Sequence, residues 1–127
     1  MTDRVLVVDD NPTNLKLACD VLQAEGYAVE QAEEAEGALA AIRARPPDLI
    51  LMDVALPGKD GFSLTRELKE DPATRHIPVI ALTAFAMRGD DEKARQAGCD
   101  GYIPKPVDTR KLPVQVADVL ARSRRRR

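Results

Sequence analysis

Short runs of apolar residues alternate along this chain with longer stretches in which apolar residues recur every three or four positions. Three of the short runs are apolar throughout, which is typical of parallel strands covered on both faces by helices. Two others are shorter or more polar, and they suit the edges of a sheet. The pattern therefore predicts five strands, at residues 5–8, 28–32, 49–52, 79–82 and 102–103.

Five helices are predicted between and after these strands. The first has Asn11 as its N-cap, Pro12 as its first residue and Gly26 as its stop signal. The fourth has only alanines on its inner face, so we expect it to pack weakly and to move easily. The fifth should begin late, because Pro113 would remove a backbone hydrogen bond from a helix that started directly after Asp108. The second to fifth helices are expected at residues 35–42, 62–70 and 91–97 and from residues 110–112 onward.

The regular alternation of strands and helices predicts an α/β fold. Five strand–helix units in succession imply a doubly wound, five-stranded parallel sheet with helices on both of its faces. In such open sheets, ligands bind beyond the carboxyl ends of the strands, at the point where the strand order reverses. The residues that follow each strand are therefore the first place to look for chemistry.

Composition and charge restrict the classes of protein to which this chain can belong. Hydrophobic residues make up 44% of the chain and charged residues 31%, which predicts one soluble domain. Its apolar runs are well short of the ~18 residues of a membrane span, and its start lacks a signal-peptide pattern. Because Cys19 and Cys99 are far apart, with no metal-ligand spacing, we expect free thiols in a reducing cytosol.

The net charge of −2 is unevenly distributed. Residues 122–127 contain five arginines, which leaves −7 for residues 1–121. We expect a single domain over residues 1–121 and a solvated arginine-rich tail over residues 122–127. An acidic body with a basic tail lacks the broad basic face of a nucleic-acid-binding fold, so no specific nucleic acid is expected as a partner.

Charged and hydroxyl side chains follow four of the five predicted strands. Asp9 and Asp10 come after the first strand, Asp53 after the third, Thr83 after the fourth and Lys105 after the fifth. Any one strand-end aspartate is usually only a turn residue or a helix N-cap. The whole set is more informative than any one residue, because a single mechanism requires all of these residue types together.

The mechanism that fits this set is phosphoryl transfer to a carboxylate. Three converging carboxylates repel one another, and a divalent cation such as Mg²⁺ (or Mn²⁺) relieves that repulsion through oxygen ligands. Lys105 adds a compact positive charge, and the Thr83 hydroxyl can hydrogen-bond a phosphoryl oxygen. An aspartate can act as the nucleophile and form an aspartyl phosphate.

Four segments in this order resemble the receiver domains of bacterial two-component response regulators, over residues 3 to about 120. They comprise the acidic pair, the phosphoacceptor with its following Asp-Gly turn, the switch threonine and the Lys-Pro segment. In this chain the segments are residues 7–11 (Val-Val-Asp-Asp-Asn), 51–61 (Leu-Met-Asp-Val-Ala-Leu-Pro-Gly-Lys-Asp-Gly), 80–84 (Ile-Ala-Leu-Thr-Ala) and 102–106 (Tyr-Ile-Pro-Lys-Pro). The resemblance implies a flavodoxin-like receiver fold with strand order 2-1-3-4-5.

The resemblance also implies a role for each site residue. Asp53 would be the phosphoacceptor, and it would share Mg²⁺ with Asp10 and the backbone carbonyl of Ala55. Asp9 would act on the metal partly through water. Thr83 and Lys105 would contact the bound phosphoryl group. The remaining implied features are a cis peptide bond between Lys105 and Pro106 and an aromatic switch at Tyr102.

The partners implied are a sensor histidine kinase or a histidine phosphotransfer protein, with no membrane as a partner. Output would be by protein–protein contact through the face formed by the fourth helix, fifth strand and fifth helix. We expect a monomer or weak dimer that acts as a switch and not as an enzyme. Residues 83–87 with Gly98 and Cys99 are similar to single-domain regulators of the cell-division type and to receivers of hybrid kinases. We favour the stand-alone regulator, with an excised hybrid-kinase receiver as the alternative.

Two positions that tune dephosphorylation in this family are apolar here. They are Ala55, two residues after the phosphoacceptor, and Phe85, two residues after the switch threonine. Neither side chain can orient an attacking water. We therefore expect slow loss of the phosphoryl group.

Three other functions remain open at this point. A flavin-binding domain would need a phosphate loop where Asp9 and Asp10 stand, together with more aromatic residues than two Tyr and two Phe. A phosphohydrolase that uses an aspartyl phosphate would usually have an Asp-x-Asp motif, whereas Asp10 is followed by Asn11 and Pro12. A degenerate receiver could bind partners without phosphate, although the complete set of acids argues against that.

Overall fold

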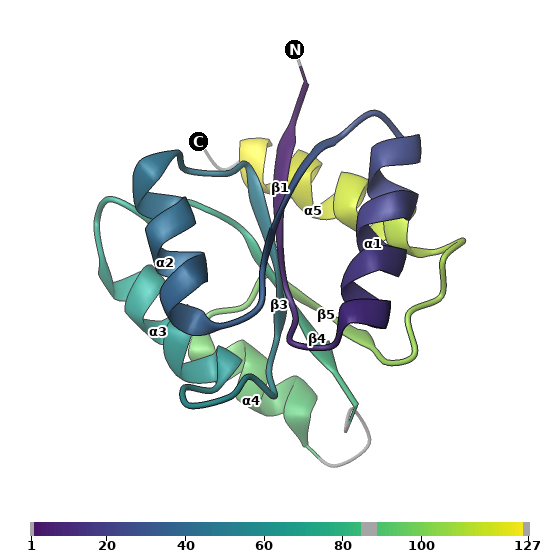
Figure 1. The fold of residues 1–127 in the computed structure, drawn as a ribbon. Coiled ribbons are helices and arrows are strands. Elements are labelled where there is room, and N and C mark those ends of the chain that lie inside the picture. Colours follow the sequence, from purple (N-terminus) through teal and green to yellow (C-terminus); the bar gives the residue numbers. More distant parts are fainter. Residues whose placement is uncertain (1, 85–88, 126–127) are drawn as a thin grey trace.

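The computed structural model describes residues 2–84 and 89–125. Its centre is a five-stranded parallel sheet with the order β2-β1-β3-β4-β5, which confirms the predicted fold class (Figure 1). The two strands predicted for the edges are the edge strands. The strands are β1 (Arg4–Val8), β2 (Ala28–Ala32), β3 (Leu49–Asp53), β4 (Val79–Thr83) and β5 (Gly101–Pro104).

Helices cover both faces of the sheet (Figure 1). One face packs against α1 (Pro12–Ala24) and α5 (Leu112–Arg125), and the other against α2 (Ala35–Ala44), α3 (Gly61–Glu70) and α4 (Asp90–Ala97). Alternate strand residues serve the two cores, so that Val5 and Val7 lie with α1 and α5 whereas Leu6 and Val8 lie with α2 and α3. The continuous apolar runs of the central strands are explained by this burial on both faces.

The helix starts follow local capping signals. Asn11 caps α1, because its side-chain oxygen accepts hydrogen bonds from the backbone N–H of Thr13 (2.9 Å) and Asn14 (3.1 Å). Asp60 caps α3 by accepting from the N–H of Ser63 at 2.9 Å. Among residues 91–97 of α4, whose burial the structure describes, Ala94 and Ala97 are the buried ones, as the sequence predicts.

Helix α5 begins late and ends late. Its first residue is Leu112, and Asp108 caps the preceding turn through the N–H of Arg110 at 2.9 Å. The helix continues to Arg125, so the predicted domain boundary at residue 121 falls inside it. Arg124 forms an ion pair with Asp3, and cationic side chains in a last helical turn also interact favourably with the helix dipole. The arginines up to Arg125 thus extend the helix. Within residues 2–84 and 89–125, no helix is both long and apolar enough to span a membrane.

Candidate functional site

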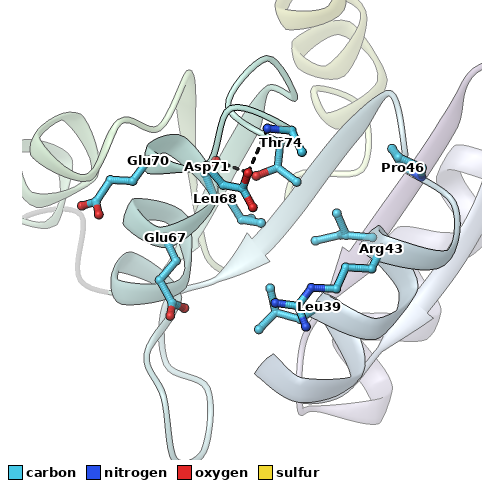
Figure 2. A pocket seen from close by; sticks show the side chains of 10 residues that line it. Leu39, Arg43, Pro46, Glu67, Leu68, Glu70, Asp71 and Thr74 are labelled. Atoms are coloured by element: carbon cyan, nitrogen blue, oxygen red, sulfur yellow. Dashed lines mark hydrogen bonds between the residues drawn. The ribbon is translucent and has the colours of Figure 1, made fainter.

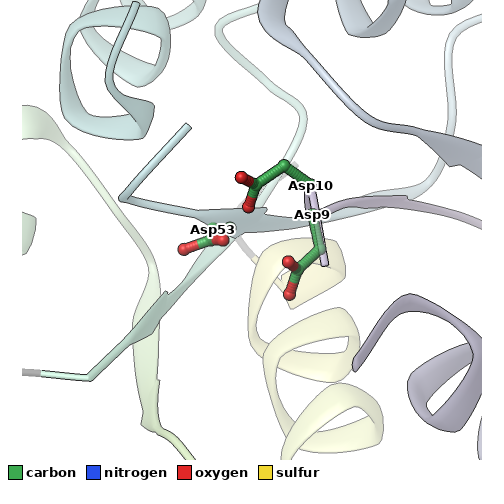
Figure 3. A group of neighbouring side chains, drawn as sticks. All are labelled: Asp9, Asp10 and Asp53. Atoms are coloured by element: carbon green, nitrogen blue, oxygen red, sulfur yellow. The ribbon is translucent and has the colours of Figure 1, made fainter. Parts of the chain in front are cut away.

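The ends of β1 and β3 bring three carboxylates together. Val8 pairs with Met52 in the parallel register, so Asp9 and Asp53 project side by side from neighbouring strands. Together with Asp10 they offer oxygen atoms that all lie within 4.8 Å of one another (Figure 3). Asp9 and Asp53 are 1% and 2% exposed, whereas Asp10 is open to solvent. Oxygen atoms at this spacing fit a hard divalent cation that is reached from the solvent side.

Backbone N–H groups fix one oxygen of each buried carboxylate. The N–H of Asn11 donates to Asp9 Oδ1 at 2.9 Å, and the N–H of Ala55 donates to Asp53 Oδ1 at 3.0 Å. The second oxygens, Asp9 Oδ2 and Asp53 Oδ2, lie 3.3 Å and 3.0 Å from Lys105 Nζ. Asp9 Oδ2 is buried and accepts no hydrogen bond within the part of the chain that the structure describes. Among the described residues, the only partner of this buried anionic oxygen is the Lys105 ammonium at 3.3 Å, which suits a position beside a bound cation.

The end of β5 positions the site lysine. The backbone N–H of Lys105 donates to the Thr83 carbonyl at 2.7 Å, which holds the start of the following loop against the end of β4. The Lys105–Pro106 peptide bond is cis. The Lys105 side chain is only 16% exposed, so its ammonium group faces Asp9 and Asp53 in a largely water-excluded setting.

These contacts shift the ionisation of the site. Burial raises the pKa of Asp9, and the neighbouring Asp53 charge raises it further, against the opposing effects of the Asn11 N–H and Lys105. Burial opposes the charge on Lys105, but the two carboxylates outweigh it and hold the pKa of Lys105 above its usual range. Lys105 thus remains a cation, and burial together with the neighbouring Asp53 charge favours the neutral form of Asp9.

The other predicted site residues lie around this centre. Thr83 ends β4 and is 1% exposed, next to the strand that carries Asp53. Ala55 is exposed in the loop after β3, and Tyr102 on β5 is 41% exposed. Phe85 falls outside the described residues. The structure therefore brings Asp9, Asp53 and Lys105 into direct contact and leaves Tyr102 on the surface.

Gly61 supports Asp53 in a way that the sequence interpretation did not include. Its N–H donates to the Val54 carbonyl at 3.0 Å, so α3 starts directly against the backbone that follows β3. A Cβ at this position would lie 2.8 Å from Val54 Cα and would also collide with the Asp53 carbonyl oxygen. The Asp-Gly pair at the start of α3 is the signal in the sequence, but by itself it indicates only a turn.

Comparisons with known proteins agree with this geometry. The sequence model of the response regulator receiver domain matches residues 5–117. The chain is 50% identical over 107 residues to the polar-differentiation response regulator DivK of Brucella ovis, covering 84% of this chain and 87% of the relative. DivK of Brucella anthropi is 49% identical over the same length.

Solved structures give the same result. A putative response regulator from Chloroflexus aurantiacus superimposes with a TM-score of 0.92 at 33% identity, over 95% of this chain and 99% of that one. A receiver domain protein from Methanospirillum hungatei gives 0.91 at 30% identity over the full length of both chains. The chain belongs to the response regulator receiver domain family and is a switch module of two-component signalling.

Proposed function

We propose that the switch works by accepting a phosphoryl group on Asp53 from the phosphohistidine of a sensor histidine kinase or a histidine phosphotransfer protein. The observation that supports this most is the position of Asp53 Oδ2. It lies 3.0 Å from Lys105 Nζ, beside Asp9 and Asp10, at the end of a central strand. This is the edge of a doubly wound sheet at which ligands bind.

In the proposed step, a carboxylate oxygen of Asp53 attacks phosphorus, a P–O bond forms and the P–N bond to the donor imidazole breaks. The carboxylates of Asp9, Asp10 and Asp53, with the Ala55 carbonyl, would hold Mg²⁺ or Mn²⁺, which would neutralise charge on the phosphoryl oxygens. Lys105 stays protonated and stabilises the same charge. Thr83 would then hydrogen-bond the bound phosphoryl group.

The proposed output is a change of surface. Movement of Thr83 toward the phosphoryl group would free space beside β4 into which Tyr102, exposed on β5, can turn. The face formed by α4, β5 and α5 would then present a different shape to an output protein. Helix α4 is suited to such a shift, because residues 91–97 bury no side chain larger than the methyl groups of two alanines. We place this switch in the cytoplasm, as a monomer or weak dimer that turns over no substrate of its own.

Intact mass spectrometry after incubation with Mg²⁺ and acetyl phosphate tests the proposal. The wild-type chain should gain one phosphoryl group, and Asp53→Ala should gain none. Asp20→Ala, which removes an exposed aspartate on α1, is the control and should behave like the wild type. Excess EDTA should prevent the gain in the wild type and in Asp20→Ala. A phosphoryl group on Asp53→Ala, or none on a folded wild type with metal present, would contradict the proposal and favour a phosphate-independent binding module.

We further predict that phosphorylated Asp53 hydrolyses slowly. Ala55 is exposed beside Asp53 and presents only a methyl group, which cannot orient an attacking water. The lifetime of the phosphoryl group should therefore be minutes or longer, and Ala55→Glu should shorten it about tenfold or more by adding a group that can act as a general base. A time course of phosphate release measures both. A wild-type lifetime of a few seconds would refute this prediction.

A further inference from the structure

A groove lies between the carboxyl-terminal halves of α2 and α3, at the opposite end of α3 from Asp53 (Figure 2). Its volume is about 500 Å³, within the range of sites that accept small ligands or anchoring side chains. Ile42 and Leu68 are buried at its base, and Leu39 is partly exposed on the α2 wall. The groove is therefore apolar at its centre.

The α3 wall is held in place by polar contacts in the turn after the helix. Thr74 Oγ1 donates to the Leu68 carbonyl at 2.7 Å, and the N–H of Ala73 donates to Asp71 Oδ1 at 2.9 Å. On the other wall, Arg4 donates to the carbonyls of Arg45 and Pro46, just beyond the end of α2. Because hydrogen bonds hold the chain just after both helices, the groove is a preformed feature.

The charges around the groove differ between its walls. The α2 wall contributes the guanidinium of Arg43, which lies alongside Leu39 in Figure 2. The α3 wall contributes Glu67 and Asp71, while the Glu70 carboxylate is directed away from the groove. Glu67 also forms an ion pair with Lys59. Both helices end here, so their carboxyl-terminal dipoles add negative potential to that of Asp71.

Each part of this lining favours a particular chemical group. The apolar base and the guanidinium of Arg43 favour a flat aromatic ring, which can be buried on one side and stacked under the guanidinium. Asp71 and the two helix ends favour a cation next to that ring. We propose that the groove docks a segment of a partner protein in which an aromatic side chain adjoins a basic one. This surface is separate from the site around Asp53 and from the α4–β5–α5 face, so its occupant could stay bound during phosphorylation.

NMR titration of the full, isotopically labelled chain with three capped dipeptides tests the proposal. The probes are acetyl-Phe-Arg amide, acetyl-Phe-Glu amide, which reverses the charge, and acetyl-Ala-Arg amide, which removes the ring. Acetyl-Phe-Arg amide should bind saturably and shift the methyl signals of Leu39, Ile42 and Leu68. The other two should bind at least several-fold more weakly.

A pair of variants adds a test of the charge argument. Asp71→Asn keeps an oxygen to accept from the Ala73 N–H but removes the negative charge, and it should weaken acetyl-Phe-Arg amide about two- to fivefold. Asp118→Asn on α5, on the other face of the sheet, is the control and should leave that Kd unchanged. Equal binding of all three probes, no saturable shift at the groove, or equal effects of the two variants would each overturn the proposal.

Discussion

Gly61→Ala should lower the free energy of unfolding by about 2–3 kcal/mol and should also slow phosphorylation of Asp53. The added Cβ would lie 2.8 Å from Val54 Cα and would press on the Asp53 carbonyl. Both neighbours are backbone atoms, so no side chain can rotate to make room. The β3–α3 connection must shift instead, and that shift moves the carboxylate whose Oδ1 is held by the Ala55 N–H. Urea unfolding and the rate of phosphorylation by acetyl phosphate measure the two effects.

Gly37→Ala is the matched control for this substitution. Gly37 lies within α2, where an added Cβ would meet only Ala32 Cβ at 3.9 Å and Glu34 Cγ at 4.0 Å. Ala is the better helix former, so this variant should be up to about 1 kcal/mol more stable than the wild type. Its phosphorylation rate should not change. If Gly61→Ala proved as stable and as active as Gly37→Ala, the close approach of α3 to Asp53 would have no functional consequence.

Asp9→Asn should stabilise the metal-free protein at pH 7 by about 1–2 kcal/mol. Asp9 is 1% exposed, its Oδ2 accepts no hydrogen bond among the described residues, and it lies beside the Asp53 carboxylate. Asparagine keeps the oxygen that accepts from the Asn11 N–H and removes the crowded charge. Lys105 loses its contact with Asp9 Oδ2 at 3.3 Å but retains its closer partner Asp53 at 3.0 Å. The stability should be measured by urea unfolding in EDTA.

The pH dependence of this effect has a definite sign. The folded-state pKa of Asp9 is raised, so between its unfolded and folded pKa values the folded protein binds more protons than the unfolded chain does. The free energy of unfolding of the wild type therefore falls as pH rises through that window. Above the window, the difference in stability between Asp9→Asn and the wild type reaches its full value. Addition of Mg²⁺ should stabilise the wild type more than the variant. A variant less stable than the wild type in EDTA at pH 7 would contradict this account of the site.

The sequence predicts the elements well where burial is uniform. The apolar run at residues 49–52 lies within β3, and the start of α1 at Pro12 is set by the Asn11 cap. Strands β3 and β4 are each one residue longer than predicted. The extended backbone continues through a polar residue at the end of each, Asp53 in β3 and Thr83 in β4. Hydrophobic periodicity cannot detect such residues, because their side chains differ from the run that they extend.

Contacts between distant segments are less accessible to sequence reasoning. Lys69 on α3 reaches Asp100 before β5 at 3.0 Å and also donates to the Ile77 carbonyl at 2.8 Å. No local pattern relates residues 31 positions apart in this way. The end of α5 at Arg125 also involves a contact with a distant segment. Arg124 in its last turn forms an ion pair with Asp3, which lies just before β1.

The site itself was predictable as a set of residue types but not as a geometry. The order of the strands indicates which residue types meet at one edge of the sheet, since parallel strands place their carboxyl ends there. That reasoning does not reveal that Asp9 Oδ2 is buried without a hydrogen bond, or that Gly61 abuts the Asp53 backbone. Both features depend on atomic packing after the chain has folded.

The most direct test of the central claim locates the phosphoryl group chemically. The chain is phosphorylated with acetyl phosphate and Mg²⁺ and then treated with borohydride, which reduces an aspartyl phosphate to homoserine. Peptide mass spectrometry then identifies the modified position. We expect homoserine at position 53 alone. Homoserine at position 9 or 10, or at no position in a chain that had gained the mass of a phosphoryl group, would contradict it.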